Sequence, residues 1–552
     1  MRGLRAAASL LAFGLLVGAV RSASAGVASG EGPAILGDTS GLTSSVCSLG
    51  PAILERIARG VRPDRGGDIQ LVPREPNFVS GGLSHAGPWD YLQRVPMLWY
   101  GPGYVRPGSY DEPVTLADIA PTAGALLRYR FDAPDGRVLT AALQPGSEGP
   151  LPRLFVTLVW DAAGREVLDT WPREWPYLQS LIRKGAWFEN ATVGASPSNT
   201  PPSHAIIGTG AYPDRTGVVD EYVSFGPVLE KPYDRGPGAL LVPTFADLYD
   251  RARDNRPIVG TVATLDPHVG MMSHGSMWGG GDRDIAVTRQ LEGSVKGGTE
   301  GLSWNLTSAM APFYRLPSYV NDIPGFKQDI ASLDRADGQL DGRWRQNSIS
   351  QLANGFDTPA RTPYQTRLIE EIVRTEGFGR DRVPDLLYLN YKAIDTIGHI
   401  FSVNSSEMKD ALDAQDPDLR SLVAFLDEQV GEGRWAMVLI ADHGHQYDPA
   451  VSGAFQIGID QVEAAIEMRF GDAEGTPLVE WVRPTEVWLD TQELARSGHD
   501  LAAVSQFVAG LTQAQTQKPG VPIEPGHAND RVFQAVFPSA MLASNPCPEG
   551  AS

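Results

Sequence analysis

An apolar run of seven residues that stops at an aspartate constrains this chain more than any other feature. Leu154 to Trp160 reads LFVTLVW and is followed directly by Asp161. Such a run is typical of a strand covered on both faces, as in a parallel sheet with helices on each side. Mostly apolar runs recur at 385–391 and 435–441, and a helical pattern precedes each of them. We therefore expect an α/β protein with a mostly parallel central sheet.

Carboxylates and histidines cluster near the ends of the two later strands. Asp395 and His399 are four residues apart, so they share one face of a helical turn and can hold one cation. Asp442 and His443 come just past the strand at 435–441 and can supply a second cation. The alternatives are a polar pair on a helix face and a solvated turn. Two clusters so placed predict a two-metal hydrolase, but they provide only four ligands and no nucleophile.

The overall charge limits the partners of the chain. Its 552 residues carry 46 basic and 66 acidic side chains, a formal net charge of −20. Proteins that coat nucleic acid need basic stripes, so this balance argues against that class. A phosphate substrate would have to be held by local positive charge, most simply by metal ions.

The N-terminus has the pattern of a secretory signal. Arg2 and Arg5 precede a mostly apolar stretch at 6–20, and residues 23–25 read ASA, a small-residue cleavage site. We expect residues 1–25 to be a signal peptide and 26–47 a linker, which places the protein in an extracellular or periplasmic space. The sequence offers no later apolar stretch of transmembrane length. An uncleaved anchor is the alternative.

Four motifs in a fixed order make the chain similar to a known group of enzymes. They are VWDAAG (159–164), NTPPSHAIIGTGAYPDRTGV (199–218), YKAIDTIGHIF (391–401) and VLIADHGH (438–445). Together they resemble the alkaline phosphatase superfamily, nearest to the type I phosphodiesterases and nucleotide pyrophosphatases and to the phosphatases with a threonine nucleophile. The resemblance implies an alkaline-phosphatase-like sheet with helices on both faces and inserted cap regions.

The resemblance also implies roles for the residues in these motifs. One Zn²⁺ would be held by four side chains: Asp161, Thr200, Asp442 and His443. Thr200 would be the nucleophile, although a simple helix cap is the alternative for this residue. Asp395, His399 and one further histidine would hold the second Zn²⁺; other divalent metals are alternatives. Two cations about 3.5–4 Å apart can bind both the attacking and the leaving oxygens of a phosphoryl displacement.

The position of the further histidine decides whether the elements of the fold follow the family's usual order along the chain. His499 and His527 lie C-terminal to the Asp-His motif, where the family has its ligand, but neither has the expected context. That context, a histidine-containing loop before a core strand, occurs instead around His85. We therefore assign His85 as the remaining ligand and infer a circularly permuted chain. A surface-loop histidine is the alternative for His85, and an unrelated N-terminal domain is the alternative to the permutation.

The permutation predicts how the chain is divided and closed. Residues 48–143 would be the displaced C-terminal portion of the catalytic fold, 144–152 a new linker, and 153–547 the catalytic core. Within that core we expect a cap at about 220–360 and a second insertion at about 450–530. The two cysteines, Cys47 and Cys547, would form a disulfide that fastens the new termini together. Two free thiols are the alternative.

Other histidines receive weaker assignments. His445 is expected outside the ligand set or exposed to solvent, and His204 is expected to pack or cap within its own helix. His268 and His274 fall in the expected cap and are predicted to lie at its surface.

Departures from the family bear on the substrate. Glu221 stands where the family often has an asparagine that binds phosphate, and 264–268 lacks a Lys/Arg pair found in some monoesterases. Fewer cations favour diesters, which carry one negative charge, although Lys392 would partly compensate. We expect a secreted two-zinc phosphodiesterase or nucleotide pyrophosphatase that acts on small phosphate esters. A phosphomonoesterase and a catalytically silent, metal-stabilised binding protein are the alternatives; a sulfatase is disfavoured because its nucleophile motif is absent.

Overall fold

The computed structural model describes residues 35–80, 82–144, 149–275, 281–289, 303–472, 475–544 and 547. The expected signal peptide, residues 26–34 of the expected N-terminal linker and residues 145–148 of the second linker lie outside this part. Among the described residues we find no helix with the length and hydrophobicity that a membrane span requires.

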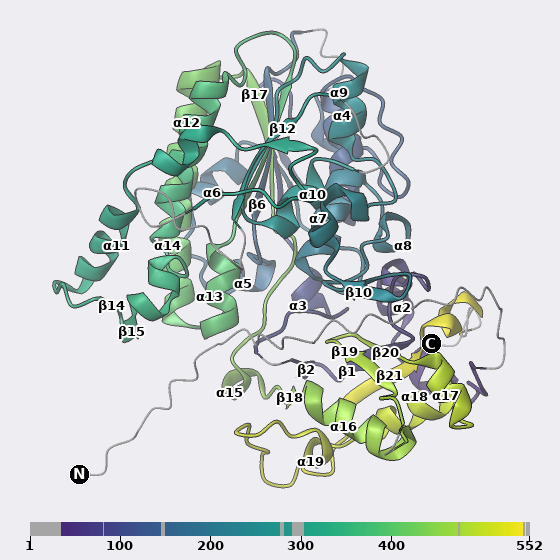
Figure 1. The fold of residues 1–552 in the computed structure, drawn as a ribbon. Helices are drawn as coiled ribbons and strands as arrows, with labels where there is room; N and C mark the ends of the chain where they lie inside the picture. Colours follow the sequence, from purple (N-terminus) through teal and green to yellow (C-terminus); the bar gives the residue numbers. More distant parts are fainter. Residues whose placement is uncertain are drawn as a thin grey trace. The chain divides into compact units, whose positions relative to one another are not determined.

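A nine-stranded sheet forms the centre of the fold (Figure 1), as expected for an α/β protein. Its strands, in spatial order, are β13 (Tyr314–Arg315), β12 (Asp284–Arg289), β11 (Val259–Leu265), β16 (Asp385–Tyr391), β6 (Leu154–Trp160), β17 (Trp435–Ile440), β3 (Met97–Tyr100), β7 (Ala186–Phe188) and β4 (Gly108–Tyr110). The strands from β13 to β17 run parallel, whereas β3 is antiparallel to both of its neighbours.

Helices cover both faces of this sheet (Figure 1). On one side lie α6 (Pro176–Ile182), α12 (Arg361–Glu376) and α14 (Ser406–Leu426); on the other lie α4 (Ile119–Leu126), α7 (Thr200–Thr209) and α9 (Phe245–Ala252). Every residue of β6, β16 and β17 is buried between them. Each large apolar side chain removed from water in this way stabilises the fold by about 1.5–3 kcal/mol.

The segment at 220–360 corrects one expectation. It was expected to be a cap, but it supplies β11, β12 and β13 to the central sheet. Glycine and threonine interrupt the apolar pattern of β11, which reads VGTVATL, and this weakens the strand signal. The helix after the PSNTPPS motif, α7, begins at Thr200 itself. Pro201 and Pro202 are tolerated there because the N–H groups of a first turn have no acceptor within the helix, so none is lost.

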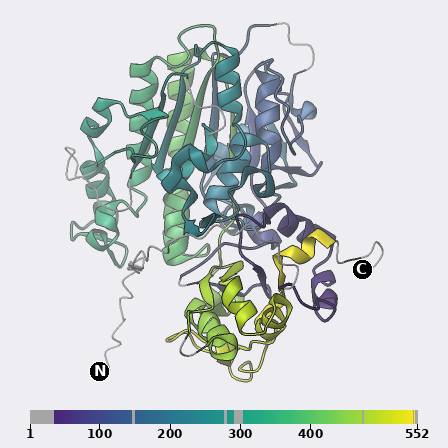
Figure 2. The same cartoon turned by 45° about the vertical axis from the view of Figure 1, so that its right-hand side comes forward.

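A second, antiparallel sheet joins the two ends of the described chain. Its order is β19 (Val479–Val482), β20 (Glu486–Leu489), β1 (Ile69–Pro73) and β21 (Phe533–Pro538). The helices α16 (Ile459–Phe470) and α18 (Leu501–Ala509) share a separate apolar core with it. Figure 2 shows the purple N-terminal segment beside the yellow C-terminal one.

The predicted disulfide is present. Cys47 ends the short helix α1 (Thr43–Cys47) and is bonded to Cys547, with their Cα atoms 5.5 Å apart and a sequence separation of 500. Residues 48–143 thus contribute β3 to the central sheet and β1 to the second sheet. The circular permutation itself stays a prediction.

Candidate metal centre

Three neighbouring strands of the central sheet deliver polar side chains to one edge. β6 is followed by Asp161, β16 by Lys392 and β17, one residue on, by Asp442. β16 and β17 flank β6, and the Asp161 N–H donates to the Tyr391 carbonyl at 3.0 Å. The carboxyl ends of parallel strands are where α/β folds place ligands, so adjacent strands bring these side chains together.

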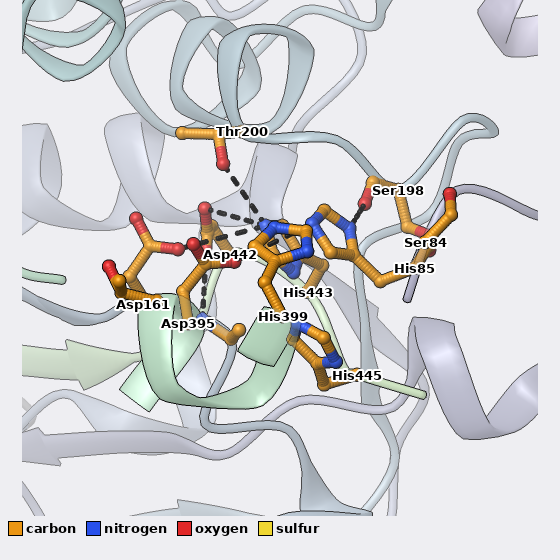
Figure 3. A network of polar contacts seen from close by, with 12 residues as sticks. Ser84, His85, Asp161, Ser198, Thr200, Asp395, His399, Asp442, His443 and His445 are labelled. Carbon is orange, nitrogen blue, oxygen red and sulfur yellow. Dashed lines mark hydrogen bonds and ion pairs between the residues drawn. The ribbon is translucent and has the colours of Figure 1, made fainter. Parts of the chain in front are cut away.

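The first cluster comprises Asp161, Asp442 and His443, whose candidate ligand atoms all lie within 4.8 Å of one another. All three side chains are fully buried. Thr200, at the start of α7, directs its hydroxyl to the same place, with Oγ1 3.2 Å from His443 Nε2 (Figure 3). His443 Nδ1 donates to the Gly444 carbonyl at 2.9 Å, which leaves Nε2 with a free lone pair.

The second cluster comprises His85, Asp395, His399 and His445. His85 Nε2 and His399 Nε2 lie 3.5 and 3.4 Å from Asp395 Oδ1. Their Nδ1 atoms donate to backbone carbonyls, His85 to Ser198 at 2.9 Å and His399 to Leu83 at 2.8 Å. This arrangement orients both Nε2 lone pairs towards the carboxylate, as second-sphere hydrogen bonds do for metal-binding histidines.

The structure thus brings together every residue that the sequence assigned to the two metals. It also adds His445, which we expected outside the ligand set or exposed; it is fully buried within the second cluster. Its ring lies against Gly398, where any Cβ would come within 2.7 Å of it, so the glycine of the DTIGH motif makes room for this histidine. The rejected candidates lie elsewhere: His499 packs on Phe470, and His527 is exposed beside Asp530.

Unsatisfied buried atoms test whether a cation fits these clusters. Asp395 Oδ1, Asp442 Oδ2 and His445 Nε2 are buried and have no hydrogen-bond partner among the described residues. Leaving a buried polar atom unpaired costs about 1–3 kcal/mol, more when it is charged. The rings of His85 and His443 stack with centroids 3.8 Å apart, so the two clusters adjoin (Figure 3). The donor set fits two divalent cations.

The electrostatics prepare most of these groups to bind a metal. Burial lowers the pKa values of His85, His443 and His445, so these imidazoles are neutral, the form that binds a metal. Burial opposes ionisation of Asp161 and Asp395, yet Lys392 holds the pKa of both carboxyls below the ordinary value.

Asp442 behaves differently. Burial, followed by the charge of Asp161, raises its pKa well above the ordinary value. Its Oδ1 accepts the Ala162 N–H at 3.0 Å. A cation bound at the first cluster would oppose both influences and favour the ionised carboxylate.

Two side chains around Asp161 have roles that the sequence did not reveal. Asp161 Oδ2 accepts hydrogen bonds from His268 Nε2 at 2.9 Å and from Asn390 Nδ2 at 2.8 Å. His268 was expected at the surface of a cap, as was His274, and both are buried. The expectation was wrong because α10 (Asp266–Met272) packs directly on α7 behind the site.

His204 lies close to the first cluster as well. Its Nδ1 is 2.9 Å from the Thr200 carbonyl, one turn earlier in α7, which fits the expected packing within its helix. The same atom is 3.5 Å from Asp442 Oδ2. His204 therefore connects the first turn of α7 to the carboxylate.

Glu221 is held by a cation of the second sheet. Its Oε2 forms an ion pair with Arg483, which lies between β19 and β20. The preceding residue, Asp220, is fully buried and accepts from the side chain of Asn199, next to Thr200. The carboxylate that would repel phosphate is therefore matched by a positive charge.

The chain matches the model of a known protein family over most of its length. The model of the type I phosphodiesterase / nucleotide pyrophosphatase family matches residues 155–517, about two thirds of the chain. This chain belongs to that family. As a member of the type I phosphodiesterase / nucleotide pyrophosphatase family it is part of the alkaline phosphatase superfamily.

Individual relatives of this family member are distant. A calcium-transporting ATPase of Myroides odoratus is 23% identical over 54% of this chain and 61% of its own length. Alkaline phosphatase PhoD of Zymomonas mobilis subsp. mobilis is 22% identical over 62% of this chain and 64% of its own length. The solved structure of wild-type alkaline phosphatase PafA is 16% identical, with a TM-score of 0.48 over 71% of this chain and 85% of that one. The chain thus spans less than two thirds of these two curated relatives.

Proposed function

We propose that this protein is a metal-dependent phosphoric ester hydrolase that uses Thr200 as its nucleophile. Its preferred substrates would be phosphodiesters or nucleotide pyrophosphates. One observation carries the proposal. The Thr200 hydroxyl lies beside a buried cluster of two carboxylates and a histidine, and a second cluster, of one carboxylate and three histidines, adjoins it.

The position of Thr200 suits an attack on phosphorus. It is the first residue of α7, a ten-residue helix whose N-terminal amides favour an anion at this point. In the reaction a bond forms between Thr200 Oγ1 and phosphorus, and the bond from phosphorus to the leaving oxygen breaks, taking its electron pair with it. The hydroxyl proton of Thr200 passes through solvent to the leaving oxygen. A water molecule then attacks phosphorus, the bond from Thr200 Oγ1 to phosphorus breaks, and a proton of that water returns to Oγ1.

The donor set favours zinc as the metal. Imidazole nitrogens and carboxylate oxygens are the ligands that Zn²⁺ takes, and in this site they come as two histidine–aspartate groups. Bound there, two such ions would stabilise the negative charge on the attacking and leaving oxygens. The chain's own residues orient the ligands through Ser198, Leu83 and Gly444, and hold Thr200 in place.

The test uses two chromogenic esters. We expect the zinc-loaded protein to hydrolyse bis(p-nitrophenyl) phosphate, to lose activity in chelator and to regain it on metal addition. Thr200→Ala is expected to lower turnover by at least about a thousandfold with its metal content retained. Thr209→Ala, at the other end of α7, is the control and keeps activity. Activity that survives in Thr200→Ala would refute the nucleophile, and no turnover with full metal loading would favour a binding protein.

A phosphomonoesterase is the second candidate, and one observation favours it. Lys392 Nζ lies 3.2 Å from Thr200 Oγ1, so a permanent positive charge faces the position of the phosphoryl group. A strong preference for p-nitrophenyl phosphate over the diester would select this candidate.

Export from the cytoplasm is part of the proposal. The Cys47–Cys547 disulfide supports it, because such bonds form and persist in oxidising compartments.

A further inference from the structure

Lys392 uses its whole hydrogen-bonding capacity inside the metal centre. An ammonium group has three N–H donors. Here Nζ lies 2.9 Å from Asp161 Oδ1, 2.8 Å from Asp395 Oδ2 and 3.2 Å from Thr200 Oγ1. One contact goes to each metal cluster and the third to the proposed nucleophile, and the side chain is buried.

We propose that Lys392 is a catalytic residue that contacts the phosphoryl group during its transfer to Thr200 and extends the substrate range to doubly charged phosphomonoesters. This inference rests on the function proposed above. Nζ is in hydrogen-bond range of the oxygen that attacks phosphorus, and once Oγ1 bonds to phosphorus the donor that contacts it can shift to a neighbouring phosphoryl oxygen. Lys392 has no role in the implied ligand set, since its ammonium offers no lone pair to a metal.

The charges of the centre show why an additional cation matters. Asp161, Asp395 and Asp442 carry three negative charges when ionised, and two divalent cations carry four positive ones. That leaves one positive charge, which matches a diester. Lys392 adds a second, which matches the two charges of a monoester, and attraction between opposite charges grows with the product of the charges.

The contact also orients the nucleophile. Lys392 can only donate, so Thr200 Oγ1 is the acceptor in their hydrogen bond. The hydroxyl hydrogen of Thr200 therefore points away from Nζ, and one lone pair of Oγ1 points towards it.

A purely structural ion pair would explain the two carboxylate contacts but not the selectivity proposed here. Removing such a pair would change the folded protein for every substrate alike. Removing a cation that touches the phosphoryl group must penalise the doubly charged substrate more than the singly charged one. The ratio of the two activities therefore separates the two roles.

The experiment compares Lys392→Met with the wild type on p-nitrophenyl phosphate and bis(p-nitrophenyl) phosphate. We expect kcat/KM for the monoester to fall about 30-fold, equivalent to about 2 kcal/mol, and that for the diester only about fivefold. Lys392→Gln, neutral but still polar, should show the same change in ratio if the Met variant folds poorly, whereas Lys392→Arg should preserve the ratio. Lys409→Met, at a half-buried lysine of α14 that also pairs with a carboxylate, Asp413, is the control. Equal losses on both substrates, or none, overturn the proposal.

Binding of inorganic phosphate gives a second readout that does not depend on turnover. Calorimetry on the zinc-loaded proteins should show about 30-fold weaker phosphate binding in Lys392→Met than in the wild type. If the wild type hydrolyses neither ester, the proposed function fails and this measurement decides only whether Lys392 contacts a bound phosphate group. Unchanged phosphate affinity then overturns it, and the expected loss supports it.

Discussion

Two pairs of carboxyl groups held away from water, one in the metal centre and one beside or in the second sheet, have pKa values shifted in opposite directions. In the metal centre, Lys392 holds the pKa of Asp161 and Asp395 below the ordinary value despite their burial. In the second sheet, burial raises the pKa of Asp68 to about 6 and that of Glu486 to about 8. Gln70 and the Gly67 N–H donate to Glu486 at 2.7 and 3.1 Å.

The difference shows what a buried cation contributes. Neutral donors form hydrogen bonds with a carboxyl group, but these offset only part of the cost of placing its charge away from water. An ammonium in direct contact does, so Asp161 and Asp395 stay ionised and can bind metals. The buried acids of the second sheet act as hydrogen-bonding groups instead. The same residue type is a ligand in one region and a structural element in the other.

The largest expected effect comes from removing a charge in the metal centre. Asp395→Asn keeps the size of the side chain but loses the carboxylate that His85, His399 and Lys392 face. We expect zinc content, measured by mass spectrometry, to fall by one ion per chain, and turnover to fall by at least about a thousandfold. In chelator the melting temperature should also fall, because Lys392 loses a partner. An Asp395→Asn variant that retains both zinc ions would show that the carboxylate of Asp395 is not needed as a metal ligand.

An intermediate effect is expected from the group behind Asp161. His268→Ala removes one of the two donors to Asp161 Oδ2 and leaves only Asn390. Loss of such an orienting partner weakens metal binding by about 10–100-fold, measured by competition with a chromogenic chelator. His274→Ala is the matched control, since His274 is also buried but pairs with Asp247. Equal effects of the two changes on zinc affinity would show that His268 only fills space.

The smallest expected effect is a change in pH dependence. Because the pKa of Glu486 is raised in the folded state, its contribution to stability is present below its ordinary value of 4.5 and is lost as the pH rises through about 8. Glu486→Gln cannot ionise, so its melting temperature should decline less than that of the wild type between about pH 5 and about pH 9. The variant gives up one acceptor, so it should be slightly less stable at the lower pH. If the melting temperatures of the two proteins change equally with pH, Glu486 does not have the raised pKa that distinguishes it from Asp161 and Asp395.

The sequence predicted what depends on local pattern and motif. The bounds of β6 and β16 follow from their apolar runs, and the positions of Asp161, Asp395 and Asp442 follow from motifs attached to strand ends. His85 could be assigned only through the family resemblance, since 310 residues separate it from Asp395. The strands β11 to β13 were missed because short strands with glycine and threonine lack a clear period.

The contacts of Lys392 and His268 could not be predicted at all. Both depend on how separate elements pack: α10 against α7, and β16 beside β6. No local pattern distinguishes a lysine directed into a metal centre from one that reaches solvent. The only sequence signal was the position of Lys392 between an apolar strand and the DTIGH motif.

The Cys47–Cys547 bond makes almost the whole described chain a covalent ring. A protease that cuts any one peptide bond between these cysteines opens the ring into a line but releases no fragment. Two cuts are needed before a piece can leave, unless the disulfide is first reduced. In surroundings rich in proteases, a single nick therefore leaves both clusters of the metal centre within one molecule.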